Sequence, residues 1–190
     1  MTELLYQGHG SYRLTSEHGA VVYIDPFAGE GYDKPADLVL VSHEHSDHNQ
    51  VSRVHLKPDG KVLRAANLID GASYGGCLVK DVLVKATAAY NKNHPKSECV
   101  GFLISTGGKK LYFACDTSRS EAMEKELPGE KLNYAFLPID GVYNMGPKEA
   151  SQCAALIEAV HSVPVHMMPG ALFLQLPDLL LHHARKCIRL

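Results

Sequence analysis

Apolar residues along this chain gather in short runs, each about as long as a β-strand and separated from the next by glycine- and proline-containing turns. The run at residues 37–41 is mostly apolar, which is typical of a strand buried on both faces. Two further runs, 100–105 and 110–114, flank Thr106-Gly107-Gly108-Lys109 and predict a β-hairpin. The same pattern predicts strands at residues 11–15, 20–24, 61–65, 76–89, 134–139 and 163–167.

Helical patterns are confined to the second half of the chain. Ser118 followed by Glu121 has the spacing of a capping box and predicts a helix to about Leu127. Pro147, a favoured first helical residue, opens a second helix. Its apolar face would consist of Ala150, Cys153, Ala154, Ile157 and Val160. Strands come first and then alternate with helices, so we expect a layered α/β (α+β) fold.

The organisation of the chain predicts one domain over residues 1–190, because we find no repeat or low-complexity linker. The segment 179–190, rich in leucine and basic residues, could form an amphipathic helix that covers a core edge or a partner surface. The composition leaves a homo-oligomer possible and does not specify one.

Composition narrows the classes of function. Nineteen lysines and arginines against 21 acidic residues give a formal charge of −2, which excludes a broad basic surface and makes a nucleic-acid partner an unfavoured hypothesis. The chain has no apolar run of membrane-spanning length and no secretory signal, so we expect a cytoplasmic protein without a membrane partner. The five cysteines have no Cys-x-x-Cys spacing and predict reduced thiols instead of disulfides or a thiolate zinc site.

The strongest chemical signal follows the apolar run 37–41 directly. The segment Ser42-His43-Glu44-His45-Ser46-Asp47-His48 places three imidazoles and two carboxylates within six positions. In an extended stretch His43 and His45 point to the same side and can reach one ion, while a turn at Ser46 would direct Asp47 and His48 to a second. A solvated loop is the alternative, but it would not need these residue types directly after a buried strand.

A metal site of nitrogen and oxygen ligands needs further donors, which we sought at the ends of later strands. His94 lies in the polar loop 91–95, Asp116 follows the second strand of the predicted hairpin, and His166 lies near the end of the last predicted strand. Each of these residues alone is more typical of a cap or a surface position. Their common placement at strand ends favours a shared site.

Taken together, this motif and these dispersed residues resemble the metallo-β-lactamase-fold hydrolases, in particular a small group of metal-dependent hydrolases related to lactonases. The resemblance extends over about residues 3–170 and includes Gly8-His9-Gly10-Ser11, Ile24-Asp25-Pro26-Phe27 and Leu137-Pro138-Ile139-Asp140-Gly141. It implies an αββα sandwich with the metals at one edge of two sheets. It also implies that His43, His45 and His94 hold one ion, that Asp47, His48 and His166 hold a second, and that Asp116 bridges the two.

A catalytic role for these ligands follows from that resemblance. Two divalent ions, with zinc as the first choice and manganese, iron or nickel open, would lower the pKa of water to about 7 and supply hydroxide at neutral pH. Asp47 could orient the nucleophile. We therefore expect hydrolysis of a small ester, lactone or phosphoester. An RNA-processing phosphodiesterase, redox chemistry at iron and a non-hydrolytic binding protein are the alternatives.

Four other residues are candidates for supporting roles near the metals. Asp25, close before the motif, could accept a hydrogen bond from a ligating imidazole, although an Asp-Pro turn explains it equally well. His9 could line the cleft or serve as a turn residue. Asn93 and Tyr143 lie near strand ends and could contact substrate, but ordinary loop polarity is an equal alternative.

Overall fold

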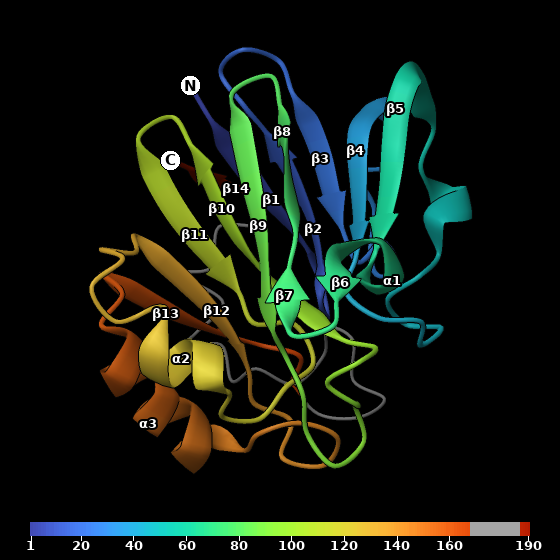
Figure 1. The fold of residues 1–190 in the computed structure, drawn as a ribbon. Helices are drawn as coiled ribbons and strands as arrows, with labels where there is room; N and C mark the ends of the chain where they lie inside the picture. The colour runs from blue at the N-terminus through green and yellow to red at the C-terminus, as the bar shows by residue number, and fades with distance from the viewer. Residues whose placement is uncertain (168–186) are drawn as a thin grey trace.

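The computed structural model describes residues 1–167 and 187–190, and within them the strands form two six-stranded sheets packed face to face (Figure 1). The first sheet consists, in spatial order, of β14 (Cys187–Arg189), β1 (Glu3–Gly8), β2 (Ser11–Thr15), β3 (Val21–Ile24), β4 (Ala36–Val41) and β5 (Leu56–Arg64). The second consists of β13 (His161–Val165), β12 (Tyr134–Pro138), β11 (Lys109–Phe113), β10 (Val100–Thr106), β9 (Val82–Ala88) and β8 (Gly76–Val79).

Strand direction is organised alike in the two sheets. The first sheet is antiparallel from β14 to β3 and parallel from β3 to β5. The second is antiparallel from β8 to β11 and parallel from β11 to β13. In consequence β1, β3 and β4 run in one direction, as do β9, β11, β12 and β13. Segments that follow these strands therefore leave each sheet at a single edge.

Short elements complete the described part of the chain. The helices α2 (Glu121–Lys125) and α3 (Pro147–Ile157) cover the outer face of the second sheet (Figure 1). The remaining short elements are η1 (Val51–Arg53), α1 (Ala65–Leu68) and a separate two-stranded antiparallel sheet of β6 (Ile69–Asp70) and β7 (Ser73–Tyr74). None of the described helices has the length and apolar character needed to cross a membrane.

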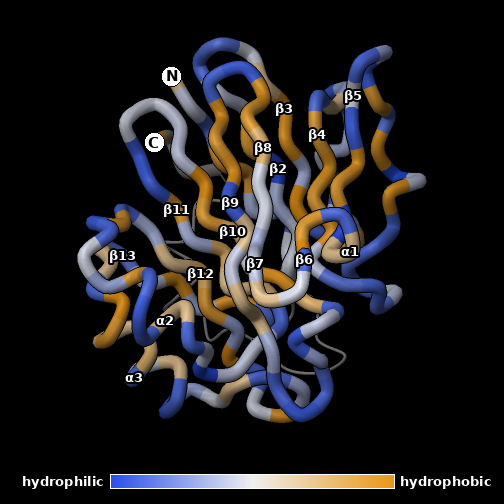
Figure 2. Tube along the Cα trace, viewed as in Figure 1, coloured by the Kyte–Doolittle hydropathy of each residue, from blue (hydrophilic) through white to orange (hydrophobic). Residues whose placement is uncertain are grey.

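The main core lies between the two sheets. Leu38 and Leu40 of β4 pack there against residues of the second sheet, including Phe102 and Phe113. The alternate residues of β4, Val39 and Val41, are buried in a separate apolar cluster that includes Tyr23 and Val54. The prediction that this strand is buried on both faces is confirmed. In Figure 2 hydrophobic colour follows β3 and β4, and many connecting loops are hydrophilic.

Strand predictions from the sequence pattern hold best where strand ends carry turn residues. The hairpin of β10 and β11 is confirmed. The predicted strand at 76–89 is two strands, β8 and β9, because Lys80 adopts a left-handed conformation and reverses the chain. The predicted strand at 61–65 is the end of the longer β5, and the last predicted strand lies two residues earlier, as β13. Strand β1 was not predicted.

Several helix predictions require correction. No capping box forms at Ser118, and α2 begins after Ser120, because Ser118 N and Arg119 N bond instead to Tyr90 O and the Glu149 carboxylate. Helix α3 ends at Ile157, so Val160 lies beyond it and is exposed. The predicted helix at 179–190 is wrong for Cys187–Arg189, which form β14, and residues 179–186 lie outside the described part.

Candidate metal centre

All seven predicted ligands meet at the edge where the carboxyl ends of like-directed strands leave the two sheets. The loop after β4 carries His43, His45, Asp47 and His48. The second sheet supplies the other three, each from a different connection: His94 lies after β9, Asp116 after β11 and His166 directly after β13. Their convergence is a consequence of strand direction, since the carboxyl ends of parallel strands form one crevice.

Two sets of side chains are placed so that each could share one cation. In the first set, His43, His45 and His94 have candidate ligand atoms that all lie within 4.8 Å of one another. The second set, defined here as Asp47, His48 and His166, meets the same limit together with His9. The structure brings together the members of each group that the family resemblance implied, with His9 added to the second, and His43, His48 and Asp116 form a third group within the same limit.

Asp116 lies between the two sets. Its Oδ1 is 3.3 Å from His48 Nε2 and 3.4 Å from His166 Nε2, both in the second set. Its Oδ2 is 3.4 Å from His94 Nε2, in the first set. Each oxygen therefore faces a different set, which is the geometry that a bridging carboxylate requires.

The four buried imidazoles are all oriented in the same way. Each has Nδ1 within hydrogen-bond distance of a polar side chain: His43 at Ser42 Oγ (3.0 Å), His48 at Asp25 Oδ2 (2.9 Å), His94 at Asn91 Oδ1 (2.8 Å) and His166 at Asp140 Oδ2 (3.2 Å). Their four Nε2 atoms and Asp116 Oδ1 are buried and have no hydrogen-bond partner within the described residues. Unpartnered buried polar atoms are costly, and one cation bound among them would satisfy several at once. The donor set therefore fits divalent metal ions.

Asp25 connects the supports of the two sets. Its carboxylate accepts hydrogen bonds from Ser42 N at 2.7 Å and Ser42 Oγ at 2.6 Å, and it lies 2.9 Å from His48 Nδ1. Since Ser42 Oγ is also the neighbour of His43 Nδ1, this fully buried carboxylate orients one imidazole of each set. This is the supporting role that the sequence allowed for Asp25.

The glycine-flanked turn around His9 belongs to the same site. A Cβ atom on Gly10 would lie 2.9 Å from His48 Cε1, so only glycine leaves room for that ring. Ser11 Oγ donates to the Asp25 carbonyl at 2.6 Å and accepts from the backbone N–H groups of Phe27 and Ala28. His9 Nε2 lies 3.0 Å from Asp47 Oδ2. This turn therefore contacts residues of the metal centre directly.

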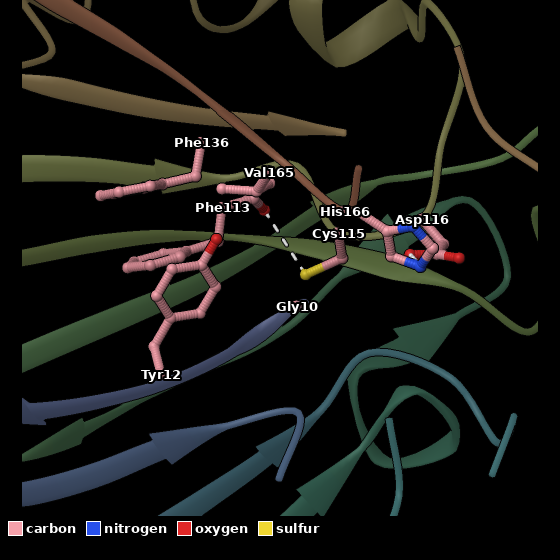
Figure 3. A pocket seen from close by; sticks show the side chains of 8 residues that line it. All are labelled: Gly10, Tyr12, Phe113, Cys115, Asp116, Phe136, Val165 and His166. Carbon is pink, nitrogen blue, oxygen red and sulfur yellow. Dashed lines mark hydrogen bonds and ion pairs between the residues drawn. The ribbon is translucent and has the colours of Figure 1, made fainter. Parts of the chain in front are cut away.

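Four non-glycine residues around the site adopt left-handed backbone conformations: His9, Asp25, Cys115 and His166, with φ between 45° and 55°. Such residues are uncommon and cluster at functional sites. Each directly follows a strand or lies one or two residues beyond it. At Cys115 the consequence is visible in Figure 3, where its thiol points back toward Phe113 while Asp116 and His166 lie together on the other side.

Asn93 and Tyr143 lie together beside the two sets. The Asn93 amide donates to the Tyr143 carbonyl at 3.0 Å, as does the Asn91 amide, so Asn93 holds the loop in place. The Tyr143 side chain is about half exposed and lines an open pocket of about 580 Å³ together with Asp47, Asp116 and His166. Asn93 lines the same pocket, so both residues are placed to meet a ligand.

Asp140, Asn91 and Ser42 were not predicted as site residues, although they orient His166, His94 and His43. Asp140 also accepts hydrogen bonds from the backbone N–H groups of the next loop, at residues 142–144. Its position after the strand β12 is the signal that could have identified it, because Asp116 was found by the same criterion. Asn91 carries no comparable signal, since polar residues are ordinary in loops.

Burial and the neighbouring charges shift the pKa values of several of these side chains. Burial, followed by the neighbouring His48, lowers the pKa of His43 to about 2. Burial also disfavours a charge on His48, but Asp116 and Asp25 outweigh it and raise the His48 pKa to about 9. For Asp116 burial is outweighed by His48 and His166, which lower its pKa to about 2. In the absence of a metal, a proton on His48 partly balances the carboxylates.

Comparison with known proteins agrees with this geometry. Residues 3–166 match the family model described as the β-lactamase superfamily domain. A metal-dependent hydrolase from Myxococcus xanthus is 31% identical, over 97% of this chain and 77% of that protein.

Solved structures show the same fold. A metallo hydrolase from Ignicoccus hospitalis superposes with a TM-score of 0.68 at 22% identity, covering 87% of this chain and 82% of the other. A metallo-β-lactamase fold protein from Bacillus subtilis gives 0.66 at 12% identity, covering 88% and 86%. The predicted metallo-β-lactamase-type sandwich is confirmed.

Proposed function

Since this chain belongs to the β-lactamase superfamily and is a metal-dependent hydrolase, we propose that it uses two divalent ions, most suitably zinc. With them it would cleave a small ester, lactone or phosphoester. The observation that carries the proposal is the set of inward Nε2 atoms on His43, His48, His94 and His166, buried beside Asp116 and without partners among the described residues. A single ion would leave part of this set unsatisfied.

Zinc suits the ligand chemistry of the two sets. They consist of imidazoles and carboxylates, without a thiolate, which is compatible with zinc and also with manganese, iron or nickel. Asp47 and Asp116 neutralise two of the four positive charges that two divalent ions carry, so the loaded site retains a positive charge that attracts anionic or polarised oxygens. Bound there, the ions supply Lewis acidity and lower the pKa of water to about 7.

The protein side chains have distinct tasks in the proposed reaction. Asp116 holds the two sets together, and Asp25 and Asp140 orient the imidazoles. Asp47, whose side chain is 37% exposed, borders the open pocket and is placed to orient the attacking water. The pocket of about 580 Å³ is of a size that admits a small molecule.

The first test measures metal content and turnover on the same sample. The protein is purified without chelator, its bound metals are quantified by mass spectrometry, and it is assayed against lactones, carboxylic esters and phosphodiesters. We expect two equivalents of metal and hydrolysis in one of these classes. Fewer than one equivalent, without uptake of added zinc or manganese, would refute the proposal.

A matched pair of variants separates the metal centre from general effects of removing histidine. His45→Ala removes an exposed ligand of the first set and should abolish hydrolysis while the protein stays folded, as judged by circular dichroism. His18→Ala removes an exposed histidine that is absent from both sets and should leave turnover unchanged. Cleavage of RNA alone, or bound iron with a redox-active absorption band, would favour the alternative functions.

A further inference from the structure

His9 is held differently from the imidazoles of the two sets. In His43, His48, His94 and His166 the anchored nitrogen is Nδ1, and Nε2 is left free inside the site. In His9 it is Nε2 that is engaged, 3.0 Å from Asp47 Oδ2. Because an ionised carboxylate can only accept, the hydrogen of this bond lies on His9 Nε2. That nitrogen is then unavailable to a metal ion.

Asp47 is the member of the second set that most needs support. Its side chain is 37% exposed, against 1% for His48 and 7% for His166. The neighbouring residues Glu44, His45 and Ser46 are exposed as well, so the loop has little packing to fix the carboxylate. An exposed carboxylate has rotamer freedom that it must lose when it binds an ion. A hydrogen bond from a fixed donor removes that freedom in advance.

His9 is such a fixed donor. Its carbonyl accepts hydrogen bonds from the Tyr6 hydroxyl at 3.1 Å and from the backbone N–H of His166 at 3.2 Å. Its ring lies against the His166 ring, with centroids 3.8 Å apart, and contacts Phe27 edge-on at 5.7 Å. The turn before β2 in the first sheet is thereby tied to the end of β13 in the second.

From these contacts we propose that His9 is a positioning residue for Asp47, and that it sets the affinity of the second set for its ion without affecting the first. The inference rests on the proposed dinuclear site and deepens it. His9, in the turn Gly8-His9-Gly10, would then orient Asp47 and not merely line the cleft. The first set, His43, His45 and His94, makes no use of Asp47 and should be indifferent to the change.

The test compares two substitutions at this position. His9→Phe keeps a ring against His166 and removes the donor, whereas His9→Gln restores an N–H donor near Asp47. Ion-free protein is titrated with zinc in competition with a chromophoric chelator, which yields two stepwise dissociation constants. For His9→Phe we expect the ion held by the second set to bind about 10 to 100-fold less tightly than in the wild type. This is the range seen when a hydrogen-bond partner of a metal ligand is lost. The first constant should stay within about twofold.

Several outcomes would overturn the inference. It fails if His9→Phe leaves both constants unchanged, if it weakens both equally, or if the wild-type protein takes up one ion only. It also fails if His9→Gln binds as weakly as His9→Phe, since His9 would then act as a ligand or a spacer and not as a donor. His18→Phe, on an exposed histidine, is the control.

The proposed function can fail separately. Wild-type protein that binds two ions but hydrolyses no ester, lactone or phosphodiester would refute the enzyme proposal and leave the role of His9 intact. Conversely, normal hydrolysis with unchanged ion binding in His9→Phe would refute only the positioning role.

Discussion

The two sheets contribute to the metal centre in contrasting ways. The first sheet supplies four of the predicted ligands from one continuous segment, residues 43–48, immediately after β4. The second supplies three, His94, Asp116 and His166, from three separate connections. The first half is thus a local motif supported by Asp25, and the second half is assembled by strand order and supported by two loops. A single change at a supporting residue should therefore affect more ligands in the first half than in the second.

Asp116 faces both ligand sets, so its loss should have the largest effect. Asp116→Asn removes a charge that faces His48, His94 and His166. We expect hydrolysis to fall by more than about 100-fold, beyond the range for residues that only support a ligand. Bound metal should fall below two equivalents, measured by mass spectrometry. Full loading with normal turnover would show that the two sets function without a bridge.

The supports of the two halves can be compared directly. Asp25→Asn disturbs Ser42 and His48 and through them both sets, whereas Asp140→Asn acts directly on His166 and reaches His94 only through Asn144 and Asn91. We expect Asp25→Asn to weaken both stepwise zinc constants by about 10 to 100-fold, and Asp140→Asn to weaken the second constant by that range and the first by less. Equal effects of the two variants on both constants would contradict the contrast between the halves.

The pH dependence of stability should also differ between histidines of the ion-free site. The His48 pKa is raised to about 9, so its contribution to stability is complete below about pH 6.5 and is lost as pH rises toward 9. The His43 pKa is lowered to about 2, so its unfolded form takes up a proton first and stability falls as pH drops below about 6.5. Urea unfolding of ion-free protein should show a maximum near pH 6.5.

The size of this effect is on the order of 3 kcal/mol for His48, from the shift in its pKa. Zinc-loaded protein should lack the loss of stability on the alkaline side, because a bound ion replaces the proton. Ion-free protein whose stability keeps rising to pH 9 would argue against the carboxylate environment of His48.

The smallest effect is expected at the pocket wall that the second sheet provides. Tyr143→Ala removes a half-exposed ring and should lower kcat/KM by about 2 to 12-fold, equivalent to about 0.5 to 1.5 kcal/mol for an aromatic contact. Metal content should not change. Tyr143→Phe keeps the ring and should retain wild-type kinetics. Identical kinetics for wild type and Tyr143→Ala would show that the substrate contacts the side of the site formed by residues 43–48 and not Tyr143.

Local patterns were sufficient for the parts of the protein that depend on neighbouring residues. The apolar run before His43 predicted a strand buried on both faces, and the turn residues between β10 and β11 predicted their hairpin. The spacing of His43, His45, Asp47 and His48 indicated a metal site because its members are close along the chain. Where a turn lacked glycine, as at Lys80, the pattern merged two strands into one.

The partners of each imidazole depend on contacts between segments far apart in sequence. Asp25 reaches His48 because β3 and β4 lie side by side in parallel, and Asp140 reaches His166 because β12 and β13 do the same. The left-handed residues His9 and Cys115 turn the chain at strand ends in a way that no periodicity encodes. The amino-acid sequence was enough to predict the metal-binding chemistry, because the types of ligand can be read directly from the residues. Which nitrogen of each histidine faces the site follows from the fold alone, because strand register and loop contacts set that orientation.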